Sequence, residues 1–363
     1  MSKESESNAP APQRLMSLDA LRGFDMFLII GGGSLIQDFT RKTQWEWDNV
    51  IGQHMQHVAW EGIQALDIVF PLFMFLAGVA IPYAIVSKLE KGEARRSLLW
   101  KVLKRVVILI LLGLVYNGAL SFNFESLRAA SVLGQIGVAY GIAALICLYS
   151  RRWTTPVYWA AGIMLGYAAL QLWLPVPGAG AGVLTQAGSV NSYIDQHFLP
   201  GRLLGGNYDP EGLLCMLSAS AIVLLGYMAG VILRSRDYSE VRKCSVLAGV
   251  GIGLIVLGML IGPHYPPIKK IWTTSFNLYA GGISMLLLAG FYLIIDVLKY
   301  QKWAFFFVVI GMNSITIYLA HRFVNFQYFS GLVFGGNASL ATIILLEWLF
   351  LWFLYKKRFF LRV

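Results

Sequence analysis

The side chains best suited to acid–base chemistry lie at the start of an apolar run, in the stretch QHMQHVAWEGIQALDIVFPLF at residues 53–73. His57 precedes the run and Asp67 lies inside it. A neutral imidazole accepts a proton and returns it near pH 7, and a nearby carboxylate can fix its tautomer. A lone histidine at such a boundary is more often an ordinary surface residue. The residues alone therefore leave His57 either as a catalytic base oriented by Asp67 or as a side chain without a chemical role.

A second group of charges lies in SLDALRGFDMFLIIGGG, at residues 17–33. Asp19 and Arg22 are three residues apart, so they can pair on one face of a helix. Ionisable groups within an apolar span are energetically costly and mark a functional site by default. We expect Arg22 to help bind an anionic ligand, and Asp19 to orient His57 if the first span brings it close. The alternative is an ion pair that only holds helices together.

Further candidate ligand-binding residues share positions at or near predicted helix ends or glycine-rich turns. They are Gly31, Gly32, Gly33, Arg128, Trp272, Ser275, Asn313 and His321. Glycines allow the close approach of a backbone or ligand, whereas Asn and Ser within spans often bond only to neighbouring helices. We find no His and acid spacing typical of a metal site and predict no metal. The three cysteines are interpreted as small packing residues.

The composition indicates a multi-span membrane protein. Of 363 residues, 57% are hydrophobic and only 13% are charged, and the mean hydropathy is +0.63. Soluble domains have about 25% charged residues. The formal net charge of +10 would suggest nucleic-acid binding if the basic residues formed one patch. They are instead distributed among the segments between apolar runs, so we predict no nucleic-acid partner.

The fold class predicted is an all-α membrane bundle of about ten transmembrane helices, since each crossing needs about 20 apolar residues. The ten segments are 15–39, 62–86, 100–121, 129–149, 155–174, 212–233, 245–262, 275–296, 303–320 and 338–356. With the N-terminus in the cytoplasm, most of the 29 Lys and Arg residues fall on the cytoplasmic side, as the positive-inside rule requires. Both termini are then cytoplasmic. Residues 1–13 are predicted to be a disordered tail before a single membrane domain, residues 14–363.

The predicted outer loops include a long Gly- and Pro-containing segment, residues 175–211. A loop of this length is usually functional or disordered. It ends in NYDPEG, where Asp209 can cap and Pro210 can begin the next helix. Pro71 is predicted to interrupt the hydrogen-bond ladder of the helix that follows His57, which is tolerated at membrane depth where polar partners or a cavity satisfy the freed groups.

Six stretches in order resemble the heparan-alpha-glucosaminide N-acetyltransferase family and its bacterial relatives. They are RLMSLDALRGFDMFLIIGGG, HVAWEGIQALDIVFPLFMFLAG, LPVPG, YDPEGLL, KKIWTTSFNLYAGG and GMNSITIYLAH. The resemblance implies a multi-pass transferase of the cytoplasmic (inner) membrane, and a homodimer. It would move an acetyl group from cytosolic acetyl-CoA to an amino sugar or oligosaccharide on the periplasmic side.

The resemblance assigns the catalytic role to His57 of the H-x-x-W motif. Asp19 and Arg22 fall on the family's D-x-x-R-G motif, and Asp67 falls on its D-x-x-F-P motif. Three residues, at two places in the chain, depart from the family pattern. Ile29 and Ile30 replace an Asn-Tyr pair of the animal enzymes, and Gln135 replaces an arginine.

Acyl transfer from a thioester requires a base to accept a proton and donors to hold the developing oxyanion. His57 is the predicted base. Arg22 and basic residues of the cytoplasmic segments are the predicted contacts of the anionic nucleotide of CoA. The sequence leaves open whether transfer is direct or passes through an acetyl-histidine. The alternative function is an N-acetylglucosamine-related sugar transporter without acyl transfer, because broken helices with buried charges also suit transport.

Overall fold

The computed structural model describes residues 15–43, 46–123, 126–334 and 339–361. The predicted disordered tail, residues 1–13, lies outside these ranges. Every regular element in the described ranges is a helix, so the predicted all-α class agrees with the structure.

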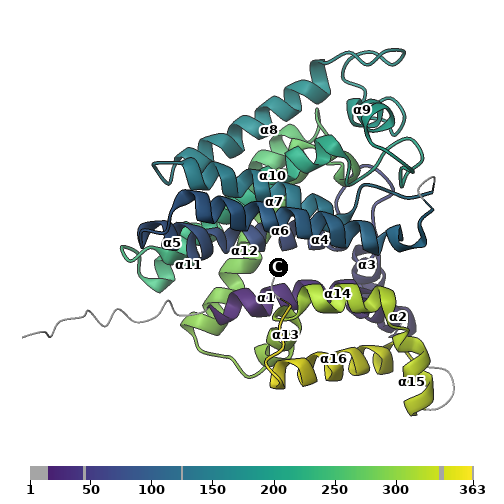
Figure 1. Ribbon diagram of the computed structural model, residues 1–363, viewed down its shortest axis with the longest axis vertical. Helices are drawn as coiled ribbons and strands as arrows, with labels where there is room; N and C mark the ends of the chain where they lie inside the picture. The colour runs from purple at the N-terminus through teal and green to yellow at the C-terminus, as the bar shows by residue number, and fades with distance from the viewer. Residues whose placement is uncertain (1–14, 44–45, 124–125, 335–338, 362–363) are drawn as a thin grey trace, which may run out of the picture.

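The chain forms the following helices, labelled as in Figure 1. They are α1 (Met16–Phe27), η1 (Leu28–Gly32), α2 (Gly33–Thr43), α3 (Glu46–His54), α4 (Ala65–Val79), η2 (Pro82–Val86), α5 (Ser87–Glu90), α6 (Arg95–Tyr116), η3 (Ala119–Ser121), α7 (Val132–Tyr149), α8 (Thr155–Trp173), α9 (Val190–Phe198), α10 (Leu213–Arg234), α11 (Glu240–Ile261), η4 (Lys269–Ile271), α12 (Thr274–Tyr292), η5 (Leu293–Val297), α13 (Ala304–Gly311), α14 (Ser314–Phe323), α15 (Phe326–Phe334) and α16 (Leu340–Lys356).

The lengths and hydropathies of these helices are those of a helical membrane protein. Among the described residues, five helices are long and apolar enough to cross a membrane, or six if α13 and α14 form one bent span. Each of the ten predicted segments contains a helix or a pair of helices. The structure therefore confirms the positions of the helices. The count of ten crossings stays a prediction, because five or six spans among the described residues have the length and hydropathy of a crossing.

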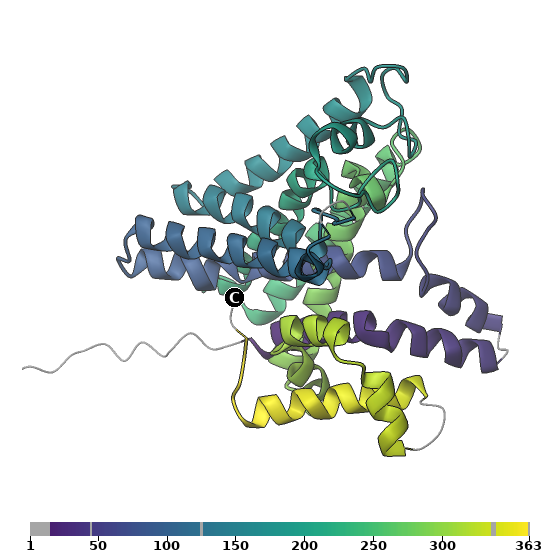
Figure 2. The ribbon, with the colours of Figure 1, turned by 45° about the vertical axis from the view of Figure 1, so that its right-hand side comes forward.

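The helices form two groups on either side of α1. Figures 1 and 2 show α13, α14 and α16 on one side of α1, and α6, α7, α8 and α10 on the other. Helix α4 packs against α10 and α12, and α12 also packs against α1 and α11. The long loop with α9 lies at the same end of the bundle as α3. The residues before α4 contact two loops, at Leu184 and at Pro267.

The packing of α1 against α13 depends on two glycines. A Cβ atom at Gly23 would lie 1.8 Å from the carbonyl oxygen of Phe307, and one at Gly311 would lie 1.9 Å from that of Asp19. Small residues at such crossings let helix backbones approach closely in a membrane. The Gly23 of the D-x-x-R-G motif therefore fixes the position of α1, and with it the position of Arg22.

Two predicted spans are interrupted. Segment 15–39 breaks within η1 at Gly31, which has φ 136° and ψ −10°, a conformation that glycine adopts at little cost. Segment 303–320 forms α13 and α14, bent by 70°. Asn313 is the N-cap residue of α14, and its side chain makes no capping hydrogen bond. Both predictions of a continuous helix were wrong.

The predicted interruption of the hydrogen-bond ladder at Pro71 falls inside a continuous helix. Helix α4 continues through the buried Pro71 from Ala65 to Val79. Proline has no N–H to donate to the carbonyl four residues earlier, which is that of Asp67. The proline therefore removes one hydrogen bond without ending the helix.

Candidate active site

His57 and Asp67 form a hydrogen-bonded pair. The Nδ1 atom of His57 lies 2.8 Å from Oδ1 of Asp67. The His57 side chain is 56% exposed, whereas that of Asp67 is 2% exposed. Because an ionised carboxylate only accepts hydrogen bonds, the contact assigns the ring proton to Nδ1. The Nε2 atom of His57 is then left with the lone pair that can accept a proton from a substrate.

The first turn of α4 fixes Asp67. Its Oδ2 atom accepts backbone N–H bonds from Val58 at 3.3 Å and from Gln64 at 3.2 Å. Gln64 is the N-cap residue of α4 and forms a capping box with Asp67. The N-terminus of a helix favours a negative charge. Backbone groups therefore hold the carboxylate in place while its Oδ1 atom faces His57.

Lys269 completes this cluster from a segment about 200 residues away in the chain. Its Nζ atom lies 3.2 Å from Oδ1 of Asp67 and 3.3 Å from Nδ1 of His57. Burial lowers the pKa of Lys269 below its usual value, although the charge and hydrogen bond of Asp67 oppose this effect. One carboxylate oxygen thus faces both an imidazole and an ammonium group.

Two other segments hold the loop that contains His57. The N–H of Gly62 donates to Pro267 at 2.9 Å, and Lys270 Nζ donates to the carbonyl of Ala59 at 2.8 Å. Trp60 Nε1 donates to the carbonyl of Leu184 in the long loop at 2.9 Å. The Trp60 ring also packs against Tyr208, with centroids 5.1 Å apart. These contacts give the half-exposed His57 a defined position.

A buried ion cluster joins the segments that precede α7 and α10. Arg128 Nε donates to Oδ2 of Asp209 at 2.7 Å, and its Nη2 atom donates to Asp209 and Glu211. Burial acts against the charge of Arg128, but the two carboxylates outweigh it and raise its pKa. Burial raises the pKa of Glu211 to about 7, although Arg128 opposes this shift. The negative charge of Glu211 also acts on Lys269.

This cluster corrects the predicted role of Asp209 as a helix cap. Gly212 is the N-cap residue of α10, whereas Asp209 binds Arg128 and accepts backbone bonds from Leu204 at 3.1 Å and Glu211 at 3.0 Å. A local capping pattern was present, but the buried guanidinium is the stronger partner.

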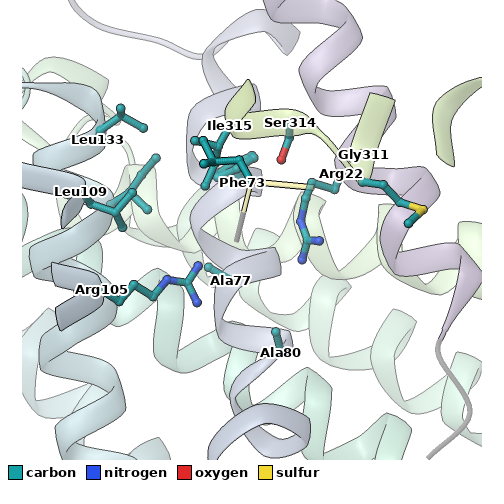
Figure 3. Close-up of a pocket in the computed structure, with 13 residues that line it drawn as sticks. Arg22, Phe73, Ala77, Ala80, Arg105, Leu109, Leu133, Gly311, Ser314 and Ile315 are labelled. Carbon is teal, nitrogen blue, oxygen red and sulfur yellow. The ribbon is translucent and has the colours of Figure 1, made fainter. Parts of the chain in front are cut away.

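A cavity of about 250 Å³ lies deeper in the bundle, between α1, α4, α6, α7 and the junction of α13 and α14. Arg22 and Arg105 line it, with Ala77 and Ala80 of α4 between them. Figure 3 shows the two arginine side chains pointing into the space beside these alanines from opposite walls. Arg105 lies over the ring of Tyr140, with its Cζ atom 4.2 Å from the centroid. The cavity is thus largely apolar with two guanidinium groups.

Polar atoms near this cavity lack partners among the described residues. They include both side-chain amide atoms of Asn313, both of Gln135 and the Nε atom of Arg105. Asn313 lies between two lining residues, Met312 and Ser314. Buried polar groups in native proteins are usually hydrogen-bonded, so each such atom suggests a water or ligand partner. The cavity is therefore suited to an anionic ligand with hydrogen-bonding groups.

Helix α4 connects the two parts of the site. Asp67 lies in its first turn, and Phe73, Ala77 and Ala80 line the cavity. With a rise of 1.5 Å per residue, Phe73 is about 9 Å and Ala80 about 20 Å along the helix from Asp67. The cavity lining on this helix therefore begins about 9 Å from Asp67 along the helix axis.

The predicted residues Arg22 and His57 lie in different parts of the site, the first in the cavity and the second in the cluster with Asp67 and Lys269. Arg22 lines the cavity. The Oδ1 atom of Asp19 lies 3.6 Å from Nη1 of Arg22. His57 contacts Asp67 and Lys269, so the structure selects Asp67 rather than Asp19 as the carboxylate that orients the imidazole.

The glycine run lies between two helices of the site. A Cβ atom at Gly31 would lie 3.4 Å from the side chain of Ile344 in α16, and one at Gly33 would lie 3.3 Å from Leu66 in α4. Gly32 is buried at the same kink. The three glycines thus fit α2 between α4 and α16.

The remaining predicted ligand-binding residues make protein contacts. Trp272 is buried and donates through Nε1 to the carbonyl of Pro210 at 3.1 Å. The Ser275 hydroxyl lies 3.0 Å from that of Thr273. His321 Nδ1 lies 2.7 Å from Oε1 of Glu347. Their predicted binding roles stay predictions.

Sequence reasoning missed four charged residues of these clusters, namely Lys269, Arg105, Glu211 and Glu347. Glu347 had a local signal, because it is a lone acid in the apolar run LATIILLEWLFLWFLYK. Arg105 had a weaker one, at the boundary between basic and apolar parts of α6. Lys269 begins η4 and Glu211 lies in the loop before α10, and only the folded chain shows their partners.

Comparisons with known proteins were consistent with a membrane transferase. A family model described as a domain of unknown function (DUF5009) matches residues 14–173. The human protein named heparan-alpha-glucosaminide N-acetyltransferase is 26% identical over 373 residues, covering 86% of this chain and 53% of the human protein. The mouse protein of the same name is 25% identical over 383 residues, covering 87% of this chain and 54% of its own. The chain spans about half the length of these curated relatives.

Proposed function

This chain is a distant homologue of the heparan-alpha-glucosaminide N-acetyltransferases, and on that premise we propose that it is a membrane-embedded acyltransferase. Its acetyl donor is acetyl-CoA and its acceptor is an amino sugar or a related oligosaccharide. The observation that supports this most is the continuity of α4, which joins the His57–Asp67–Lys269 cluster to a cavity with two arginines.

The proposed orientation places both termini in the cytoplasm, with ten crossings formed by the helices or helix pairs of the ten predicted segments. The basic residues at the start of α6 then lie on the cytoplasmic side. The His57 cluster and the long loop lie on the periplasmic side. Acetyl-CoA would enter from the cytoplasm, and the acceptor would approach from the opposite side.

The cavity suits CoA by its charge and its polar groups. Guanidinium groups bind phosphates through paired hydrogen bonds, and Arg22 and Arg105 provide two of them. Stacking on Tyr140 holds Arg105 in the cavity wall. The pantetheine arm of CoA contains two amides. The unpartnered side-chain amides of Asn313 and Gln135, each next to a lining residue in the sequence, are the proposed partners. The thioester end of the arm would then extend along α4 toward Nε2 of His57.

His57 acts as the general base in this proposal. The acceptor nitrogen attacks the thioester carbonyl, a C–N bond forms, and the C–S bond breaks. The amine proton passes to Nε2 of His57 and then to the leaving thiolate, so that the products are an amide and CoA thiol. Asp67 keeps the other ring proton on Nδ1 and stabilises the imidazolium while it carries the extra proton.

The first test is the binding of acetyl-CoA to the purified, detergent-solubilised protein by calorimetry. We expect Arg22→Ala and Arg105→Ala each to raise the Kd about tenfold or more, because each removes a charged hydrogen bond worth about 1.5–3 kcal/mol. Lys104→Ala is the matched control, since Lys104 is an exposed cation on the same helix as Arg105. Its Kd should equal that of the wild type.

Two results would contradict the proposal. Unchanged Kd values in both arginine variants would remove the cavity as the CoA site. Sugar flux across vesicles without any requirement for CoA would favour the transporter function instead. Transfer of labelled acetyl groups to glucosamine by the wild type, and its loss in the arginine variants at limiting acetyl-CoA, would support the acyltransferase.

A further inference from the structure

Lys269 is held rigidly against the His57 pair by its own segment. The backbone N–H of Thr273 donates to Ile268 at 3.2 Å, and the Thr273 hydroxyl accepts the N–H of Ile268 at 2.9 Å. Trp272, which follows η4, has φ 48° and is 1% exposed. A bulky residue with this left-handed backbone is held there only by the surrounding structure. The ammonium group of Lys269 is therefore placed by a closed turn with a buried anchor.

The proton positions around this ammonium group are restricted. A lysine ammonium only donates hydrogen bonds, and Nδ1 of His57 already uses its proton toward Asp67 at 2.8 Å. Lys269 can donate to Oδ1 of Asp67 at 3.2 Å, but the 3.3 Å approach to Nδ1 brings a cation against a protonated ring nitrogen. An added ring proton would place a second positive charge beside the ammonium group, and repulsion between the two charges opposes this.

We propose that Lys269 is a positioning residue that keeps His57 unprotonated in the resting protein and makes its imidazolium a stronger acid during turnover. The inference rests on the proposed function for its catalytic meaning. Asp67 alone would favour a charged imidazole, because an opposite charge nearby stabilises the ionised form. Lys269 shares the same carboxylate oxygen and offsets that effect, so Asp67 orients the ring without trapping a proton on it.

The other charges near His57 do not replace Lys269. Lys270 donates to the carbonyl of Ala59. Glu211 acts on Lys269 from the loop before α10, but it is paired with Arg128. Among the described residues, Lys269 is therefore the cation that contacts both His57 and Asp67.

This role has a consequence for both proton transfers of the proposed reaction. At the pH where the chain works, a neutral Nε2 atom is available to accept the amine proton. Repulsion from Lys269 then favours delivery of that proton to the thiolate sulfur as the C–S bond breaks. A histidine with only a carboxylate neighbour would accept the proton readily and release it less readily.

The test measures the protonation of His57 without using acyl transfer. Diethyl pyrocarbonate modifies the unprotonated imidazole nitrogen, and mass spectrometry of the His57 peptide gives the rate at each pH. We expect the midpoint of this profile to move up by about one pH unit in Lys269→Gln, the effect of one unit charge at this separation in a partly hydrated site. In Lys269→Arg, which keeps the charge, the midpoint should stay within about a third of a unit.

Lys270→Gln is the matched control, because it removes an adjacent cation whose ammonium bonds to a backbone carbonyl. Its midpoint should move by less than a third of the Lys269→Gln shift. Gel filtration and equal limiting rates at high pH would show that each variant is folded and that His57 is equally accessible. If Lys269→Gln does not fold, Lys269→Met takes its place because it keeps the apolar stem.

A midpoint in the folded Lys269 variant equal to that of the wild type would overturn the inference. A shift as large in Lys270→Gln would overturn it as well. The midpoint would then depend on the total positive charge near His57 and not on the contact with Lys269. Failure of the wild type to transfer acetyl groups would instead overturn the proposed function, while the diethyl pyrocarbonate profiles would still report on Lys269.

Discussion

The structure contains two histidine–carboxylate pairs of nearly equal geometry. His57 Nδ1 lies 2.8 Å from Asp67, and His321 Nδ1 lies 2.7 Å from Glu347. Both carboxylates are buried, and both histidines are about half exposed. Both pairs also connect to the cavity, the first through α4 and the second through α14, whose first residue Ser314 lines it.

The surroundings of the two carboxylates differ. Asp67 accepts two backbone N–H bonds, the imidazole bond and the Lys269 contact. Glu347 accepts the imidazole bond, and its Oε2 atom is buried without a partner among the described residues. The pair itself therefore does not identify the reaction centre. The backbone cradle and the neighbouring cation distinguish the first pair, and the predictions below test whether that distinction is functional.

The largest effect is expected for His57→Ala. Acetyl transfer should fall about 1000-fold, since general acid–base groups contribute about 100- to 10,000-fold. Acetyl-CoA affinity should change little, because the proposed phosphate contacts lie along α4 in the cavity. His54→Ala, at an exposed histidine of the preceding helix, should retain full activity. A rate near that of the wild type in His57→Ala would remove the first pair as the reaction centre.

A smaller loss is expected for Asp67→Asn. The amide can accept the proton of Nδ1 only through its oxygen, and it no longer stabilises an imidazolium or binds the Lys269 ammonium. We expect acetyl transfer to fall about 100-fold, measured with saturating acetyl-CoA. The same variant should lower the pH midpoint of His57 modification by diethyl pyrocarbonate, since one negative charge is lost. An unchanged rate would show that orientation by Asp67 is dispensable.

The third prediction concerns the charges that surround the first pair. Burial raises the folded-state pKa of Glu211 to about 7, above its unfolded value of about 4.3. The folded state therefore binds more protons between these values. This contribution to stability is complete below about pH 4 and is lost as the pH rises through about 7.

We therefore expect the apparent Tm of the wild type to fall by a few degrees between pH 5 and pH 8, and this fall to be smaller in Glu211→Gln. Differential scanning fluorimetry in detergent would measure it. Glu93→Gln, at a residue on the exposed turn before α6 that contacts Lys101, is the control. It should retain the wild-type pH dependence. Equal slopes in the wild type and Glu211→Gln would show that the ion cluster does not titrate in this range.

The sequence predicted much of the fold and singled out His57 and Asp67, which are in contact in the structure, but it did not identify the charges around them. Long apolar runs located the helices because membrane insertion depends on local composition. His57 and Asp67 were found because they lie ten residues apart at one helix start. Lys269 could not be found in this way, since its contacts with them depend on two loops meeting in space.

The helix breaks were also difficult to predict from the sequence, and so were the partners in the ion cluster. The apolar run 303–320 predicted one continuous span, whereas α13 ends at Gly311 and α14 begins at Ser314. Asp209 precedes a helix and so resembled a local cap, whereas its partner Arg128 is 81 residues earlier. Local preferences of this kind are weaker than a buried, charged hydrogen bond.

The smallest effect is expected for the second pair, and it is the sharpest test of the comparison. In Glu347→Gln, the amide oxygen can still accept the Nδ1 proton of His321, and the lost charge had no neighbouring cation comparable to Lys269 among the described contacts. Acetyl transfer should therefore change by less than about threefold. The wild-type pH midpoint of His57 modification should also be retained. A loss comparable to that of Asp67→Asn would mean that α14 brings His321 into the reaction, and that a buried carboxylate behind an imidazole is sufficient without the cradle and the cation.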